Sequence, residues 1–149
     1  MKELEYDLFE KEVIQLLSKK TQMAVATCNK NRVTVRTVYV ICQGTKVFFI
    51  TKKAYTKYKQ IIKNPNVALC VDNIQIEGVA QIKGHPNDDQ NKEIIDFCLK
   101  HGYEDFKRYM RYKNIVLIQV EPSLITLWRN NGREYLDIDK VKAYRVGKG

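Results

Sequence analysis

The chain has 149 residues, the length of one ordinary domain, and can bury a core without help from a metal or a disulfide. Its 26 Lys and Arg outnumber its 17 Asp and Glu, and the formal net charge of +9 favours phosphates, nucleic acid or acidic surfaces as partners. No apolar run reaches the length of a membrane span and the first residues lack an apolar signal core, so we expect a cytoplasmic protein with no membrane partner.

The cysteines form no CxxC pair and have no histidine at zinc-finger spacing, so we expect reduced core residues and no metal site. They are Cys28, Cys42, Cys70 and Cys98.

The first half of the chain reads as a helix, three strands and a second, short helix. Apolar residues at helical spacing predict an amphipathic helix over residues 3–18. Its apolar positions are Leu4, Leu8, Val13, Leu16 and Leu17. Segments rich in Val, Thr, Phe and Tyr, separated by turn formers, predict an antiparallel meander with strands at 23–28, 33–42 and 46–51. A basic segment that Pro65 closes predicts a short helix at 54–63.

The second half reads as two strands, a helical region and two more strands. Residues 66–71 and 75–83 have strand composition. The second segment alternates between apolar and polar positions, so we expect one of its faces to be exposed to solvent. Helical spacing predicts a helix over 88–100 that stops at Gly102, followed by a helical turn at 104–111. Further strands are expected at 114–121 and 124–129, divided by Pro122 and Ser123, and the tail from Arg133 contains at most one weak strand.

These elements give six or seven strands in sequence-local pairs. Successive short strands without regular helical crossovers favour an antiparallel barrel over a doubly wound parallel sheet. No repeat or linker divides the chain. We therefore expect a mainly β fold, a barrel with flanking helices, in a single domain over residues 1–149.

Three residues around the third strand form a plausible phosphate cradle. Arg36 interrupts an otherwise uncharged strand, Thr51 ends the next strand, and Lys57 lies near the start of the short helix, where free backbone amides favour an anion. A buried arginine needs an anion, because burying its charge unpaired costs several kcal/mol. The alternatives are an exposed Arg36 on an edge strand and a solvated, lysine-rich helix face.

The sequence gives little support to other kinds of catalytic site. The sequence contains no GxSxG, HExxH, P-loop or Rossmann glycine pattern. Both histidines, His85 and His101, fall in predicted loops or helix ends, where a solvated role is more common than catalysis. Any chemistry must therefore be carried by a cofactor.

Four separated segments share a family pattern. They read RTVYVI at 36–41, VFFIT at 47–51, YTKYKQIIKNPNVAL at 55–69 and NIQIEGVAQI at 73–82. In this order and spacing the chain resembles the flavin-binding split-barrel family related to pyridoxamine 5'-phosphate oxidase, over roughly residues 5–130, and most of all its short, general-stress-protein type members. The resemblance implies a six- to seven-stranded antiparallel split barrel that binds FMN.

The resemblance also implies which residues meet the cofactor. Arg36 would reach the FMN phosphate, and backbone groups of the same strand would meet the isoalloxazine ring. The family's serine, arginine and lysine phosphate motif falls on Tyr55, Thr56 and Lys57, so only the lysine is retained. The implied cofactor-binding residues are Arg36, Thr37, Val38, Tyr39, Ile50, Thr51, Thr56, Lys57, Asn73 and Trp128. Asn73 replaces a family glutamine near the flavin, and Trp128 would lie against the cofactor across a subunit interface.

The departures from the pattern limit the function that the resemblance implies. Ile41 stands where the oxidases carry a lysine for the substrate phosphate, and their tyrosine, arginine and serine substrate contacts have no counterpart in FKRYMRYKN. We therefore expect a homodimeric FMN-dependent oxidoreductase that is not a true pyridoxamine phosphate oxidase. It would pass electrons between a nicotinamide cofactor and a small acceptor.

Two alternatives remain open from the sequence. The charge and the nine tyrosines fit a non-enzymatic nucleic-acid-binding barrel. The basic residues are spread along the chain without aromatic-basic alternation on adjacent strands, which makes nucleic acid the less favoured partner. The other alternative is a split barrel that holds a deazaflavin or haem, or stores flavin without turnover, and the scarcity of histidines weakens haem.

Overall fold

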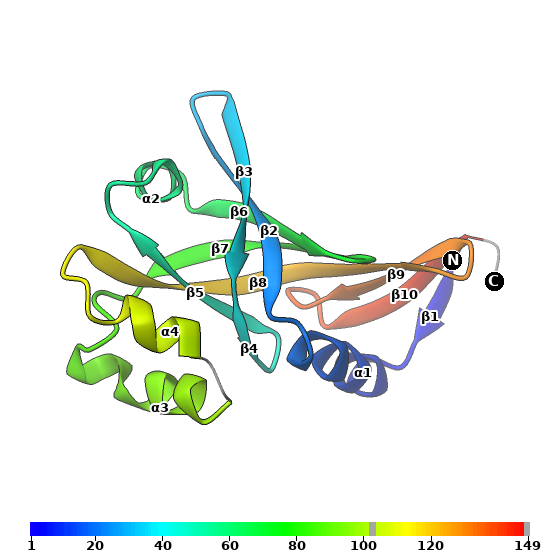
Figure 1. Ribbon diagram of the computed structural model, residues 1–149. Helices are drawn as coiled ribbons and strands as arrows, with labels where there is room; N and C mark the ends of the chain where they lie inside the picture. The colour runs from blue at the N-terminus through cyan, green and yellow to red at the C-terminus, as the bar shows by residue number, and fades with distance from the viewer. Residues whose placement is uncertain (102–103, 148–149) are drawn as a thin grey trace.

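The computed structural model describes residues 1–101 and 104–147 (Figure 1). The helices are α1 (Tyr6–Ser18), α2 (Thr56–Ile61), the 3-10 turn η1 (Asp89–Asn91), α3 (Lys92–Lys100) and α4 (Glu104–Tyr109). The strands are β1 (Lys2–Leu4), β2 (Gln22–Asn29), β3 (Arg32–Tyr39), β4 (Ile41–Gln43), β5 (Lys46–Lys52), β6 (Asn66–Val71), β7 (Ile74–Ile82), β8 (Ile115–Arg129), β9 (Gly132–Asp137) and β10 (Lys142–Gly147). The expected helix cap Gly102 lies outside the described residues.

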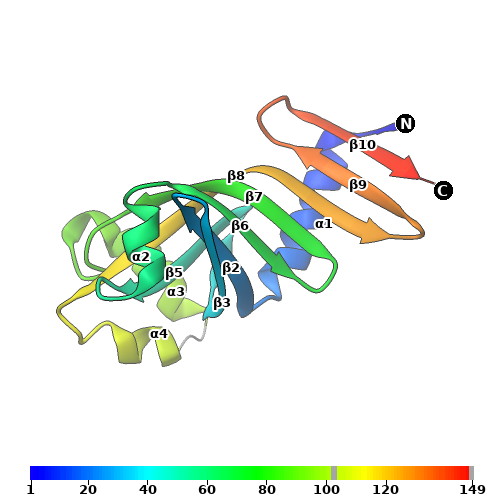
Figure 2. The same ribbon diagram turned by 90° about the horizontal axis from the view of Figure 1, so that it is seen from above.

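All strand pairs are antiparallel, so the predicted mainly β class is confirmed. The order along the sheet is β1-β10-β9-β8-β7-β6-β2-β3, and β5 pairs with both β4 and β8. Strand β8 joins the two parts of the molecule, because its first half pairs with β5 and its second half with β9. The first half belongs to the barrel. The second half, with β9, β10 and β1, projects from it as the wing (Figure 2). Helix α1 packs between the wing and β4.

The buried face of helix α1 differs in part from the predicted one. Its buried side chains are Phe9, Val13 and Leu17, which lie four residues apart on one face. Leu8 was expected on that face but is 67% exposed. The helix begins at Tyr6, later than predicted, because the preceding residues pair with β10 and the Glu5 side chain accepts a hydrogen bond from the Leu8 amide at 2.9 Å.

Strand β8 corrects the prediction of two strands divided at Pro122. The strand continues through the proline because its partner β7 shifts register there: Gly78 faces Pro122, Glu77 faces Leu124, and Ser123 is the extra residue of a bulge. Only glycine fits at position 78, since a Cβ atom there would lie 2.6 Å from the Glu121 carbonyl oxygen. The bulge redirects β8 from the barrel toward the wing.

The tail corrects the prediction of at most one weak strand. Residues 132–147 form the hairpin β9–β10, and the whole sheet has ten strands where six or seven were expected. Asn130 and Asn131 both have positive φ, at 53° and 58°, which produces the tight turn into β9. The predicted strand 33–42 is also divided into β3 and β4.

The cysteines are all free, but only one is fully buried. Cys98 belongs to the core, Cys28 and Cys42 are partly buried, and Cys70 is exposed, which corrects the expectation of four core residues. Among the residues that the structure describes, no group of three His, Cys, Asp or Glu side chains is arranged to hold a metal. Within the same residues, no helix is both long enough and apolar enough to span a membrane.

Candidate functional site

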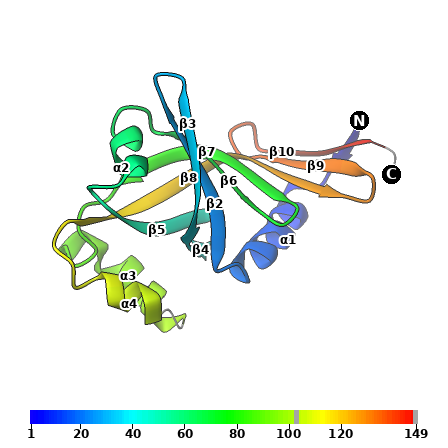
Figure 3. The ribbon, with the colours of Figure 1, turned by 45° about the horizontal axis from the view of Figure 1, so that its top comes forward.

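A cavity of about 200 Å³ lies where β3, β5, α2 and α4 meet. Helices α2 and α4 lie on either side of β5 in Figures 1 and 3. Most of the lining is aromatic, aliphatic or hydroxylic, its only charged members are two lysines, and it contains no carboxylate. The lining residues are Thr37, Val38, Tyr39, Ile50, Thr51, Lys52, Tyr55, Lys57, Phe106, Tyr109 and Ile115. The cavity is therefore suited to a planar ligand with an anionic group.

Lys57 is the central cation of this cavity. It lies in the first turn of α2 and only 8% of the residue is exposed, although its side chain is charged. Burial, and secondly the nearby charge of Arg36, lower the pKa of Lys57 from 10.5 to about 8. Its Nζ lies 4.6 Å from the ring centroid of Tyr55, and no described carboxylate pairs with it. An anion in the cavity would stabilise this charge directly.

Arg36 lies behind Lys57 and does not line the cavity. Its guanidinium donates hydrogen bonds to the Val25 carbonyl at 3.2 Å, to Thr27 Oγ1 at 2.8 Å and to Thr34 Oγ1. Desolvation lowers the pKa of Arg36, but the side chain finds neutral acceptors and no described carboxylate. Gln60 of α2 accepts from both threonine hydroxyls and donates to the Arg32 carbonyl at 3.1 Å. This network holds a second positive charge at a set position beside Lys57.

The structure brings together six of the residues that the sequence assigned to the cofactor. Thr37, Val38 and Tyr39 line one wall of the cavity from β3. Ile50 and Thr51 reach it from the end of β5, and Lys57 reaches it from α2. Their convergence follows from the turn between β5 and α2, which returns the chain toward β3.

Thr56, Asn73 and Trp128 lie apart from this group. Thr56 begins α2 without lining the cavity. Asn73 and Trp128 contact each other, through an Asn73 side-chain amide that donates to the Trp128 carbonyl at 3.0 Å. They lie at the wing end of β8, whereas Ile115 at its other end lines the cavity. At about 3.3 Å per residue this separation is about 43 Å along the strand, and Trp128 does not line the cavity of its own chain.

Sequence reasoning missed five lining residues: Lys52, Tyr55, Phe106, Tyr109 and Ile115. Lys52 directly follows Thr51, the last residue of the predicted strand, and also lines the cavity. The contributions of α4 and β8 depend on contacts with β5 more than 50 residues earlier in the chain, for which no local pattern exists. The repeated Tyr and basic residues of 106–113 were the available signal.

The histidines have structural partners. His85 Nε2 lies 2.8 Å from the Tyr112 carbonyl, and His85 Nδ1 accepts from the Asn87 amide. His101 Nδ1 lies 2.9 Å from the Phe97 carbonyl. Neither lines the cavity, in agreement with the roles expected from their loop and helix-end positions.

Comparison with known proteins identifies the family. The family model described as pyridoxamine 5'-phosphate oxidase matches residues 9–129, which is most of the chain and includes the whole cavity. The chain belongs to the pyridoxamine 5'-phosphate oxidase family. No curated protein matches it.

Several solved structures share the fold at low sequence identity. A protein from Clostridium acetobutylicum related to general stress protein 26 has a TM-score of 0.68 and 15% identity, covering 93% of this chain and 99% of its own. HutZ, the heme storage protein from Vibrio cholerae, has a TM-score of 0.64 and 13% identity, with 76% and 89% covered. A FAD-binding protein from Mesorhizobium loti has a TM-score of 0.60 and 11% identity, with 77% and 90% covered. At such identities the likeness establishes the split-barrel fold.

Proposed function

We propose that the protein binds FMN, with the phosphate beside Lys57 and the ring along β3 and the end of β5. The observation that carries this proposal is a largely buried lysine, next to an arginine, in a cavity without a carboxylate. A phosphate dianion would relieve the repulsion between the two cations and restore the charged state that burial disfavours. Backbone groups of Thr37, Val38 and Tyr39 supply hydrogen-bonding partners for a ring.

The donor set favours flavin over haem. The similar structures include both a FAD-binding and a heme storage protein. The cavity offers a phosphate-sized cationic site, but its lining contains no His, Cys or Met to serve as an axial iron ligand. The lining tyrosines are the remaining candidates for an axial ligand of haem iron, but their ring faces are equally suited to stacking on a flavin ring.

The size of the cavity favours a homodimer. Its volume of about 200 Å³ is below the roughly 300 Å³ at which pockets begin to enclose a small-molecule ligand, so one chain would cover only part of FMN. Large apolar side chains are meanwhile exposed: Val33 and Val35 of the edge strand β3 by 67% and 66%, and Trp128 of β8 by 52%. A second copy would cover exposed apolar residues such as these and bring its own Trp128 toward the flavin.

Bound flavin would supply transfer of electrons between a nicotinamide cofactor and a small acceptor. The protein would hold the phosphate with Lys57, keep the charge of Arg36 close to it, and shield one face of the ring with β3 and β5. Ile41 is apolar and 6% exposed where the oxidases have a substrate-binding lysine, which supports an activity other than pyridoxamine phosphate oxidation.

The test is a titration of purified protein with FMN, monitored by flavin fluorescence and the visible spectrum. We expect saturable binding, and a loss of affinity of at least tenfold in Lys57→Ala. Lys59→Ala is the matched control, because Lys59 is exposed on the same helix. Equal affinity of Lys57→Ala and the parent chain, or a Soret band with haem and no response to FMN, would refute the assignment.

A further inference from the structure

Two distant segments of similar composition meet at the mouth of the cavity. Residues 52–59 and 106–113 each contain four cationic residues, two tyrosines and no acidic residue. A hydrogen bond of 2.9 Å from the Lys53 amide to the Asn114 carbonyl holds the ends of the two segments together. The fold thus concentrates positive charge and aromatic rings on one edge of the site.

Cations and rings alternate along this edge. Lys52 Nζ lies 5.7 Å from the ring centroid of Tyr55 and 4.9 Å from that of Tyr112. The Arg111 guanidinium lies 5.6 Å from the Tyr112 centroid, and the rings of Tyr109 and Tyr112 are 6.3 Å apart. We call these five residues, Lys52, Tyr55, Tyr109, Arg111 and Tyr112, the tyrosine–cation rim.

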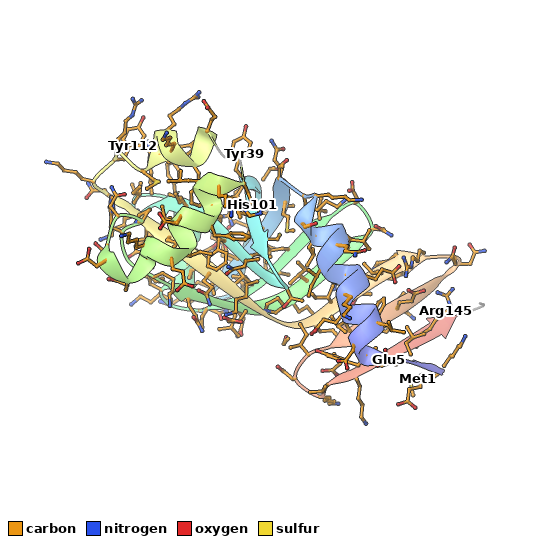
Figure 4. The ribbon with its side chains drawn as sticks, turned by 90° about the horizontal axis from the view of Figure 1, so that it is seen from below. Met1, Glu5, Tyr39, His101, Tyr112 and Arg145 are labelled. Carbon is orange, nitrogen blue, oxygen red and sulfur yellow. The ribbon has the colours of Figure 1, made fainter. Side chains whose placement is uncertain are left out.

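The rim is open to solvent and has no anionic partner within the described part of the chain. Tyr55, Tyr109 and Tyr112 are 47%, 39% and 40% exposed, which is high for such large apolar rings. No described carboxylate lies within ion-pair distance of Lys52 or Arg111. Figure 4 shows Tyr112 at the end of the molecule that carries α4, far from the wing marked by Glu5 and Arg145. Solvent-facing rings separated by unpaired cations are suited to a ligand that has both bases and phosphates.

We propose that the tyrosine–cation rim docks the adenosine and phosphate part of a nicotinamide dinucleotide, and that it prefers the form with the additional ribose phosphate. This inference rests on the proposed function, in which the cavity holds the flavin. The rim shares Lys52, Tyr55 and Tyr109 with the cavity lining, so a ligand lying on it extends directly toward the ring. Tyrosine faces receive the adenine, while Lys52 and Arg111 neutralise phosphates.

A dinucleotide fits these observations better than nucleic acid does. The alternating residues form one short arc that ends in the cavity, and the interactions available are enough for one base and a few phosphates. A strand of nucleic acid would need rings and cations repeated across the surface, and the opposite end of the molecule instead has carboxylates paired with arginines, as in the contact of Arg145 with Glu134.

The experiment compares the parent protein with the double variant Arg111→Gln and Tyr112→Leu, and with the control Lys140→Gln in the exposed turn before β10. With FMN bound, we expect the double variant to raise the KM for NADPH about tenfold or more, with kcat nearly unchanged, and to reduce the preference for NADPH over NADH. FMN affinity should stay unchanged, because neither residue lines the cavity. An unchanged KM and preference would overturn the inference.

Equilibrium titration with adenosine 2',5'-bisphosphate separates the two proposals. If FMN does not bind, the proposed function fails, but weaker binding of the bisphosphate to the double variant than to the parent still supports the rim as a nucleotide phosphate site. If the parent binds single-stranded oligonucleotides in preference to the bisphosphate and loses them in the double variant, the rim is a nucleic-acid surface and the dinucleotide inference is wrong.

Discussion

Replacing Lys57 by methionine should make the ligand-free protein more stable while removing most of its affinity for FMN. Lys57 is 8% exposed, and its pKa is lowered from 10.5 to about 8 by burial and by Arg36. Methionine has a similar length and fills the same space without a charge. The substitution therefore separates the free-energy cost of burying the charge from the contribution of that charge to FMN affinity.

The expected magnitude follows from the pKa. A shift from 10.5 to about 8 corresponds to at most about 3 kcal/mol of unfavourable free energy for holding the protonated lysine in the folded state. The sign follows from proton binding. Between pH 8 and 10.5 the unfolded chain binds more protons at this residue than the folded chain, so the parent gains stability as the pH rises through that window. The methionine variant should be more stable at pH 7 and lack this gain.

The assay is urea unfolding in phosphate-free buffer at pH 7 and at several values up to pH 10, together with FMN titration. Loss of one charge-assisted contact, worth roughly 1.5–3 kcal/mol, should weaken FMN binding by roughly 10- to 150-fold. Lys59→Met, on the exposed side of α2, is the control. It should change neither the free energy of unfolding nor the FMN affinity much. A Lys57→Met variant that is less stable than the parent at pH 7 and still binds FMN tightly would refute the reasoning.

Further predictions concern affinity, the bulge, the wing and the dimer. FMN affinity of the parent should decline as pH rises above about 8, where Lys57 loses its proton, and a flat profile through pH 9 would contradict this. Gly78→Ala should destabilise by roughly 1–3 kcal/mol in thermal or urea unfolding, because its Cβ would meet a backbone oxygen at 2.6 Å. Arg129→Met should cost about 1–3 kcal/mol, since it breaks contacts of 2.7 Å with both Glu12 and Glu134, and equal stability would show that the ion pairs do not hold α1 to the wing. Trp128→Ala should weaken FMN binding only at concentrations where sedimentation shows a dimer, and loss of affinity in a monomer would exclude the contact in trans.

Local patterns in the sequence determined the class and order of most elements. Alternation over 75–83 and helical spacing over 88–100 are properties of neighbouring residues, so they indicated a strand and a helix without reference to the rest of the chain. The spacing from Thr51 to Lys57 likewise placed a lysine in the first turn of a helix, and the family pattern linked it to β3. These interactions depend on chain geometry over a few residues.

Tertiary structure alone decided what completes the site. Lys52 lies near both Tyr55 and Tyr112 only because α4 and the start of β8 return to the end of β5. Arg36 turns inward because Thr27 and Thr34 are close enough to accept its hydrogen bonds. The wing hairpin and the bulge at Pro122 also depend on partners from other strands, whose favourable pairing outweighs weak local propensity. Long-range contacts of this kind contribute free energy that no short window of sequence contains. They bring two lysines and four aromatic rings to the lining of one cavity and place Arg36, Arg111 and Tyr112 close beside it.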